Sequence, residues 1–250
     1  MHHPARSAWT GEWRPALRRL ASLCLLGAAA AGLQAAPKVE DSMAQRVQAC
    51  TGCHGKEGRA ASDGYYPRIA GKPARYLHNQ LLNFREGRRR YALMTALLEP
   101  LSDEYLREIA DHFSSLDLPY APQQPSSEPP ALLQRGQELA MRGDAALKIP
   151  ACVQCHGQAL TGVAPAIPGL LGLPRDYVVG QLAVWKSGSR RAHEPDCMAQ
   201  IAQRLGPGDI GAVARWLAAQ PVPSQAKPAA SLPAPLPMAC GSVVPDGATR

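Results

Sequence analysis

Two short cysteine motifs are the part of this sequence that most directly implies chemistry. Residues 50–54 are CTGCH and residues 152–156 are CVQCH, so the pattern C-x-x-C-H occurs twice. In this pattern both thiols form thioether bonds to the vinyl groups of a porphyrin, and the adjacent histidine binds the iron. The sequence therefore predicts two covalently bound haem c groups. The expected attachment residues are Cys50, Cys53, Cys152 and Cys155, and the expected histidine ligands are His54 and His156.

Two other uses of paired cysteines fit less well. A thioredoxin-like dithiol needs a preceding strand in a βαβ unit, whereas helix-like stretches, 42–49 and 132–141, precede the motifs here. A zinc site built from both cysteine pairs would tolerate the spacing. It would not account for the histidine that follows each second cysteine, nor for the repeated segment after each motif.

The segments that follow the two motifs are copies of one another, which indicates a duplicated domain. At an offset of 101 residues, the identical residues are Pro67, Gly71, Pro73, Tyr76, Gln80, Leu81, Gly87, Arg89 and Arg90, while Phe84 aligns with Trp185. A small insertion in the second copy then changes the offset to 104, and this aligns Leu101, Ile109 and Ala110 with Leu205, Val213 and Ala214.

The composition of the chain suggests where its domains begin and end. Residues 37–118 and 131–221 each contain one copy of the repeat, and residues 119–130 between them include five prolines. A proline-rich stretch of this kind is typical of a semi-rigid linker. Residues 222–250 are again rich in proline, alanine and serine, which predicts an irregular tail.

The first 36 residues have the layout of a secretory signal peptide. They contain basic residues, then a largely apolar run over 20–31, and they end in small residues. The apolar run is shorter than the ~20 residues of a membrane span. We therefore expect export and a periplasmic protein, with the mature chain beginning near Ala36 or Pro37.

Each repeat is predicted to be helical, so the fold class is all-α. Tyr76, Gln80 and Phe84 recur at helical spacing within residues 73–86, and Ser102 precedes a second apolar stripe as a helix-capping residue. Aromatic residues make up only 5% of the chain and phenylalanine occurs twice. A domain of ~80 residues has little apolar surface to bury, so we expect the haem to supply part of each core.

The second axial ligand should recur at matching positions in the two copies. Met94 lies 40 residues after His54, Met198 lies 42 after His156, and each lies seven residues before a matched leucine. His78, His112 and His193 have no such counterparts. A core-filling role is the alternative for both methionines. The carbonyls of Pro67 and Pro168 are candidate acceptors for the axial histidines, and Tyr76, Tyr177, Trp185 and the arginine pairs are candidate partners for the haem propionates.

Two cysteines remain after the haem motifs are accounted for. Of seven cysteines, Cys24 lies in the predicted signal peptide and four belong to the motifs, which leaves Cys197 and Cys240. In an oxidising compartment two leftover thiols most often pair, and a Cys197–Cys240 bridge would attach the tail to the second domain. The alternative is that Cys197 is a thiolate ligand or a reactive site.

The charge of the chain limits its partners. Without the first 36 residues the chain has 23 basic and 19 acidic residues, a net charge of +4 that four haem propionates would largely offset. The basic composition is therefore no evidence for nucleic acid. Docking charge would be local, for example at 85–90 or 190–191. The sequence leaves peripheral membrane association and the oligomeric state open.

The order of these motifs, present twice over residues 40–220, resembles the di-haem cytochrome c4 family. The resemblance implies two tandem class I cytochrome c domains related by a pseudo-twofold axis, with facing propionate edges and histidine–methionine ligation. It carries the iron ligands over to His54 and Met94, and to His156 and Met198. It also implies periplasmic electron transfer toward terminal oxidases. Cys197, the single methionine of the first Met loop and the tail with Cys240 depart from the family pattern.

Three functions are compatible with this sequence. The favoured one is an electron carrier, not an enzyme, that exchanges single electrons with a donor such as a quinol–cytochrome c reductase or a dehydrogenase and with an acceptor such as a terminal oxidase. The second is a di-haem enzyme of thiosulfate oxidation or peroxide reduction, for which only Cys197, His193 and Glu194 could form a site unique to one haem. The third is the cytochrome subunit of a dehydrogenase or oxidase complex.

Overall fold

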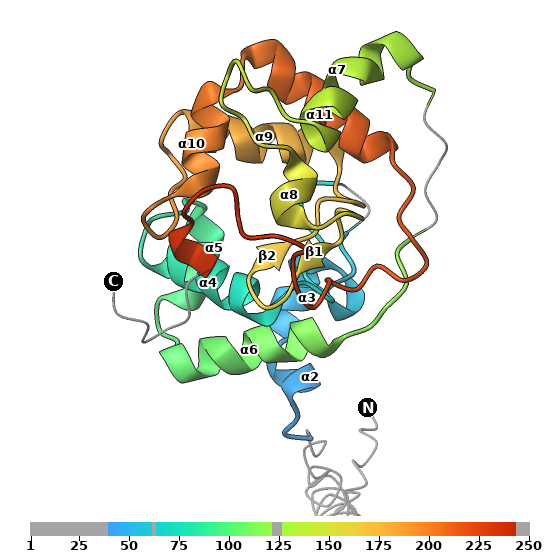
Figure 1. The fold of residues 1–250 in the computed structure, drawn as a ribbon. Coiled ribbons are helices and arrows are strands. Elements are labelled where there is room, and N and C mark those ends of the chain that lie inside the picture. The colour runs from blue at the N-terminus through green and yellow to red at the C-terminus, as the bar shows by residue number, and fades with distance from the viewer. Residues whose placement is uncertain (1–39, 62–63, 122–126, 244–250) are drawn as a thin grey trace, which may run out of the picture. The chain divides into compact units, whose positions relative to one another are not determined.

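The protein is mainly helical in this computed structural model, which describes residues 40–61, 64–121 and 127–243 (Figure 1). The predicted all-α class is confirmed, although a short β-hairpin in the second half was not predicted. The predicted signal peptide, 1–36, lies outside the described residues. Among the residues that are described, no helix has the length and apolar character needed to cross a membrane.

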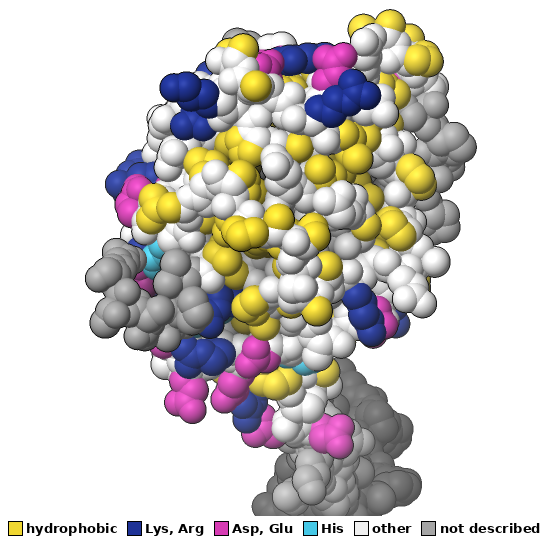
Figure 2. Space-filling model, viewed as in Figure 1, with side chains coloured by type: hydrophobic (Ala, Val, Ile, Leu, Met, Phe, Trp, Pro, Cys, Tyr) yellow, Lys and Arg dark blue, Asp and Glu magenta, His cyan; other side chains and the backbone are white. Residues whose placement is uncertain are grey.

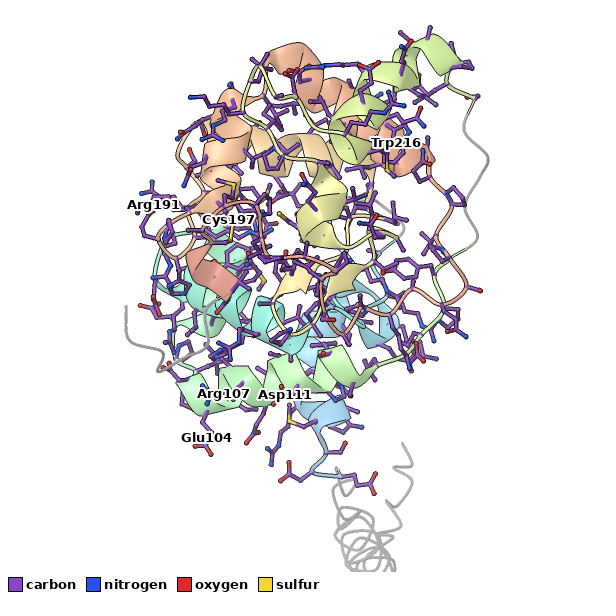
Figure 3. All side chains as sticks on the ribbon, in the orientation of Figure 1. Glu104, Arg107, Asp111, Arg191, Cys197 and Trp216 are labelled. Carbon is purple, nitrogen blue, oxygen red and sulfur yellow. A yellow bond between two sulfur atoms is a disulfide. The ribbon has the colours of Figure 1, made fainter. Side chains whose placement is uncertain are left out.

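The first half of the molecule is a small bundle of helices. Its elements are α2 (Met43–Arg46), α3 (Gln48–His54), the 3₁₀ turn η1 (Lys56–Gly58), α4 (Ala74–Arg85), α5 (Ala92–Leu98) and α6 (Asp103–Ser115). The Ser102 hydroxyl caps α6 by accepting a hydrogen bond from the Tyr105 amide at 3.2 Å. One face of α6 buries Leu106, Ile109 and Phe113 against α4. Its opposite face carries Glu104, Arg107 and Asp111 outward (Figure 3).

The second half repeats this arrangement around its own hydrophobic core. Its elements are α7 (Pro130–Met141), α8 (Cys152–His156), β1 (Gly162–Val163), β2 (Ile167–Pro168), α9 (Arg175–Lys186), α10 (Cys197–Arg204) and α11 (Pro207–Ala219). Helix α11 packs against α7 and α9, as α6 packs against α4. The matched pairs α4/α9, α5/α10 and α6/α11 are the structural form of the sequence repeat.

Residues 222–243 form an extended tail that returns along both halves (red in Figure 1). Its backbone pairs with β1 through Ala229, whose amide donates to the Gly162 carbonyl at 2.9 Å. A disulfide joins Cys240 to Cys197 at the start of α10, just before the 3₁₀ turn η2 (Gly241–Val243). Figure 2 shows apolar side chains over the middle of the face that the tail crosses, with most charged side chains toward its border.

The crossing of α7 and α11 depends on a glycine. A Cβ atom at Gly136 would lie 2.2 Å from the Ala212 carbonyl oxygen and 2.7 Å from the Trp216 Cβ. Because the nearest obstacle is backbone, a side chain cannot be accommodated by a rotamer change, and the helices would have to separate.

We therefore expect Gly136→Ala to lower the free energy of unfolding of the haem-loaded protein by about 1–3 kcal/mol, as overpacking of a core does. Urea unfolding followed by helical circular dichroism measures this change. Gly211→Ala is the matched control on α11, because a Cβ there would meet no atom within 4 Å. The control should be stabilised by up to ~1 kcal/mol through helix propensity. Equal stability of the two variants would contradict the close-packed crossing.

Candidate haem sites

Both cysteine motifs open into one cavity of about 1400 Å³. The free thiols of both motifs line it, as do the two motif histidines and most of the apolar faces of α4, α5, α9 and α10. The cavity thus reaches into both hydrophobic cores. The apolar side chains of each half leave this space inside their core. A large planar apolar group attached to each motif would fill it. The lining sulfurs and nitrogens are those of Cys50, Cys53, His54, Cys152, Cys155 and His156.

The first motif occupies α3, and the chain then turns sharply to hold its histidine. Gly55 ends α3 with φ +76°, where a Cβ would lie 2.2 Å from the Ala60 carbonyl oxygen, so this turn requires glycine. The following loop brings the Pro67 carbonyl to 2.8 Å from His54 Nδ1. A carbonyl only accepts, so Nδ1 carries the proton and Nε2 presents its lone pair. Burial lowers the pKa of His54, which also favours the neutral ring.

The second motif has the same geometry in a more enclosed setting. His156 Nδ1 lies 2.8 Å from the Pro168 carbonyl oxygen, and the short hairpin of β1 and β2 holds Pro168 in place. Only 8% of His156 is exposed, and burial lowers its pKa as well. The expected carbonyl acceptors, Pro67 and Pro168, are therefore the residues that the structure places at the two histidines.

Met94 and Met198 line the same cavity as the histidines. Met94 lies on α5 and packs against the first core, while Met198 lies on α10 and packs against the second. Asp196 caps α10 by accepting from the Ala199 amide at 3.0 Å, and this fixes the first turn on which Met198 lies. The structure thus brings each methionine to the cavity in the same half as the histidine with which the sequence pairs it.

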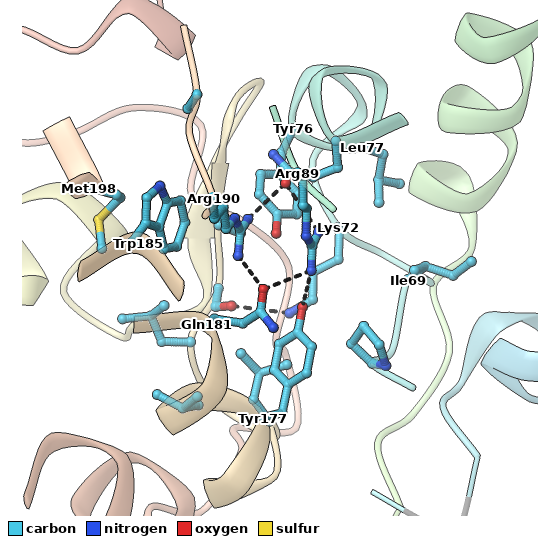
Figure 4. Close-up of a pocket in the computed structure, with 18 of the residues that line it drawn as sticks. Ile69, Lys72, Tyr76, Leu77, Arg89, Tyr177, Gln181, Trp185, Arg190 and Met198 are labelled. Carbon is cyan, nitrogen blue, oxygen red and sulfur yellow. Dashed lines mark hydrogen bonds between the residues drawn. The ribbon is translucent and has the colours of Figure 1, made fainter. Parts of the chain in front are cut away.

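Between the two halves lies a hydrogen-bonded network (Figure 4), in which the arginines and Tyr177 were expected as propionate partners but Gln80, Gln181 and the bonds across the halves were not predicted. Arg89 donates to Gln80 Oε1 at 3.2 Å within its own half, and to Gln181 Oε1 at 2.9 Å in the other. Arg190 likewise donates to Gln181, and it donates to Gln80 Oε1 at 2.8 Å. Each glutamine oxygen therefore accepts from both arginines, and Tyr177 accepts from Arg89 at 3.0 Å. All of these residues are matched pairs of the repeat, which was the signal that could have identified them.

The network holds two positive charges without a carboxylate. Among the described residues, no Asp or Glu side chain hydrogen-bonds to either guanidinium. Only 3% of Arg190 is exposed; its burial, and then the charge of Arg89, lowers its pKa to about 10. The buried Trp185 indole N–H also lacks an acceptor in the described part of the chain, and Arg190 lies 3.6 Å above its ring. Haem propionates would supply the missing anionic acceptors.

This burial corrects one expectation about docking. Arg190 and Arg191 were considered as a surface patch, but Arg190 is enclosed and only Arg191 is exposed (Figure 3). A further buried cation, Lys72, was not predicted. Its ammonium donates to the Gly169 carbonyl at 3.2 Å across the two halves, and burial lowers its pKa to about 8. The cavity between the two sites is therefore strongly cationic.

Cys197 is not available as a ligand, which corrects the alternative of a thiolate site. Its sulfur is bonded to Cys240. Of the other residues considered for an asymmetric catalytic site, Glu194 accepts from the Asp196 amide at 3.0 Å. In the described part of the chain, neither His193 nor Glu194 lines the cavity.

No protein-family model matches this chain. It is 36% identical to a thiosulfate dehydrogenase electron acceptor from Thiomonas intermedia over 211 residues, which are 82% of this chain and 93% of that protein. It is 33% identical to a cytochrome c4 from Pseudomonas aeruginosa, covering 69% of this chain and 84% of that one.

Solved structures agree with these relatives. Reduced cytochrome c4 from Pseudomonas stutzeri superposes with a TM-score of 0.60 and 30% identity over 70% of this chain and 95% of that chain. The thiosulfate dehydrogenase TsdBA from Marichromatium purpuratum gives 0.61 and 31% identity over 69% of this chain, which spans only 36% of that longer chain. The duplicated motifs, the matched halves and these similarities together show that the chain belongs to the cytochrome c4 family of di-haem electron-transfer proteins.

Proposed function

We propose that this di-haem cytochrome is a periplasmic electron carrier that accepts electrons from a thiosulfate-oxidising dehydrogenase. The observation that carries the proposal is the equivalence of the two sites, because each has a histidine held by a proline carbonyl and a methionine in the same cavity. A carrier needs two such closed sites, whereas an enzyme needs polar groups that converge on one haem. The bound haems supply one-electron exchange between ferric and ferrous iron.

The residues of the chain have distinct roles in this proposal. His54 and Met94 bind the first iron, and His156 and Met198 bind the second. Cys50, Cys53, Cys152 and Cys155 hold the haems covalently, so neither haem dissociates during turnover. The carbonyls at Pro67 and Pro168 fix the histidine rings and raise their basicity. Arg89, Arg190 and the Trp185 indole bind the propionates.

We favour the dehydrogenase as the donor because this chain matches an electron acceptor of such an enzyme over more of its length than it matches a cytochrome c4. The Thiomonas intermedia thiosulfate dehydrogenase electron acceptor matches 82% of this chain, whereas the Pseudomonas aeruginosa cytochrome c4 matches 69%. A second relative with the same description, from Stutzerimonas stutzeri, is 35% identical over 69% of the chain. The protein then passes electrons to a terminal oxidase or another acceptor.

The ligand assignment predicts a specific optical result. Ferric haem with a methionine sulfur ligand has a weak far-red band, and both haems should contribute to it equally. Met94→Leu and Met198→Leu should each remove half of the band and leave the thioether-bound haem in place. Met141→Leu, on the exposed side of α7, is the control and should leave the band unchanged. A full band in either cavity variant would contradict the assignment.

The buried arginine predicts an effect on the reduction potential. A positive charge stabilises the haem that has gained an electron, so Arg190→Gln should lower the potential of the nearer haem. The expected decrease is on the order of 59 mV, a tenfold change in the equilibrium constant for one electron. Spectroelectrochemical titration measures it. Arg191→Gln removes a neighbouring exposed charge that solvent screens, and an equal decrease in this variant would contradict the propionate role.

The proposed donor is tested directly by mixing the ferric protein with a thiosulfate dehydrogenase and thiosulfate. We expect both haems to be reduced, and the rate to fall as ionic strength rises if charge guides the encounter. Thiosulfate alone should produce no reduction. Reduction without the dehydrogenase would favour the enzyme hypothesis, and reduction no faster than that of an unrelated c-type cytochrome would contradict the proposed partner.

A further inference from the structure

The tail forms part of the wall of the cavity, next to the point where Cys240 is bonded to Cys197. Leu236, Met238 and Cys240 are half-buried and line the cavity, whereas the alternating residues Pro235, Pro237 and Ala239 are exposed. This alternation means that one face of the extended segment is turned to the cavity and the other to water. The tail therefore separates the second site from solvent on the side where Met198 lies.

The tail is anchored on both sides of that site. Before the cavity, it pairs with the hairpin through Ala229, close to the strand that carries the Pro168 carbonyl. Beyond it, the disulfide ties Cys240 to Cys197, and the Gly241 amide donates to the Pro195 carbonyl at 3.0 Å. Its last described turn then reaches the other half.

That last contact is with α4. Asn79, which is only 8% exposed, donates to the Ser242 carbonyl at 3.1 Å. The tail thus runs from the hairpin to α10, where Cys197 marks the disulfide in Figure 3, and its last described residues contact a helix of the first half. It has no counterpart within the repeat.

Among the residues that the structure describes, those at the corresponding positions around the first site are open. By the offsets of the repeat, Cys197 corresponds to Leu93, which is 64% exposed next to Met94. Asn79 corresponds to Gly180 on α9, where a Cβ would meet no atom within 4 Å. Buried Ala166 corresponds to Tyr65, which is 60% exposed. In the described part of the chain, large apolar side chains are therefore exposed at the first site, where the tail or the hairpin lies at the corresponding positions of the second.

We propose that the disulfide-anchored tail closes the edge of the second haem and thereby confines electron exchange with partner proteins to the edge of the first haem. The docking surface is the apolar patch of Tyr65, Leu93 and Leu97 beside Met94. Its occupant is a redox protein that presents an apolar segment around its own redox centre. Electrons would then reach the second site chiefly from the first, across the interface where Arg89 and Arg190 bind the glutamines of the opposite half.

The chemistry of the partner is inferred from the face of the second half that corresponds to this docking surface. On the second half, a chain segment with apolar side chains, Leu236 and Met238, lines the cavity between its anchors at the hairpin and at Cys197. The pseudo-symmetric face of the first half presents leucines at the same place, so it suits a partner segment of the same chemistry. Arg90 is exposed at its border and lines the same cavity, which favours a partner with an acidic rim.

Access to the two haem edges can be measured without any partner. In the oxidised protein, the haem methyl protons have resolved hyperfine-shifted NMR signals, and a soluble neutral gadolinium chelate broadens those near solvent. We expect several-fold greater broadening for the first haem than for the second. In a Cys197→Ser/Cys240→Ser double variant, and in a chain ending at Val222, the second haem should become as accessible as the first. Both variants must retain the far-red methionine bands, so that the ligands are intact.

If the shortened chain fails to fold, the double variant, which keeps the full chain, shows by itself whether the tail protects the second haem. Equal broadening of both haems in the wild-type protein would overturn the proposal. So would a second haem that stays protected when the disulfide is removed and the tail is cut away.

The docking surface is tested with the dehydrogenase, and this part rests on the proposed function. Leu93→Glu should lower the second-order rate of reduction about tenfold by placing a buried charge in the encounter surface. Leu132→Glu is the control, since Leu132 is an exposed leucine on α7 that lies outside the cavity wall. Equal rates for the two variants would overturn the docking surface. A dehydrogenase that reduces no variant and no wild-type protein contradicts the proposed donor alone, because the NMR experiment decides the closure of the second haem independently.

Discussion

One buried and one half-buried guanidinium group, neither bonded to a carboxylate in the described part of the chain, are the constraint on which this structure depends. Arg89 and Arg190 share the oxygens of Gln80 and Gln181, so each half completes the hydrogen bonds of the other. Two like charges held close together, one of them buried, raise the free energy of the folded chain unless anions neutralise them. The haem propionates provide that neutralisation in our proposal, so that loading of the cofactor and docking of the two halves stabilise one another.

In our proposal, electrons pass between the two sites across the same interface. Both cysteine motifs open into one cavity, and the cationic groups of Arg89, Arg190 and Lys72 lie between them. Positive charge there stabilises the reduced state of either haem. The two sites are nevertheless unequal, because Lys72 corresponds to Leu173 in the repeat and donates to the loop that holds His156. The duplication thus supplies two similar carriers, and single substitutions distinguish them.

The tail shows how a duplicated protein can lose its symmetry without changing its fold. A leucine next to the first methionine is replaced by Cys197 next to the second, and this one change allows the tail to be attached covalently. The leucine that remains exposed at the first site is then available for an encounter with another protein. A few residues at matched positions make the two sites differ in how far partners can approach them. The helices that hold the haems are the same in both halves of the chain.

The sequence by itself determined the cofactor, the duplication and the helices, because these depend on spacing along the chain. C-x-x-C-H fixes two sulfurs and a nitrogen within two helical turns, and the repeat identified Met94 and Met198 as a matched pair. Pro67 and Pro168 were expected as carbonyl acceptors for the same local reason. The tertiary structure alone decided that Arg190 is buried rather than part of a docking patch, that Lys72 crosses the interface, and that the tail lines the second site. These features join residues that are distant in sequence, and their burial depends on how the two halves and the tail pack together, which no local pattern records.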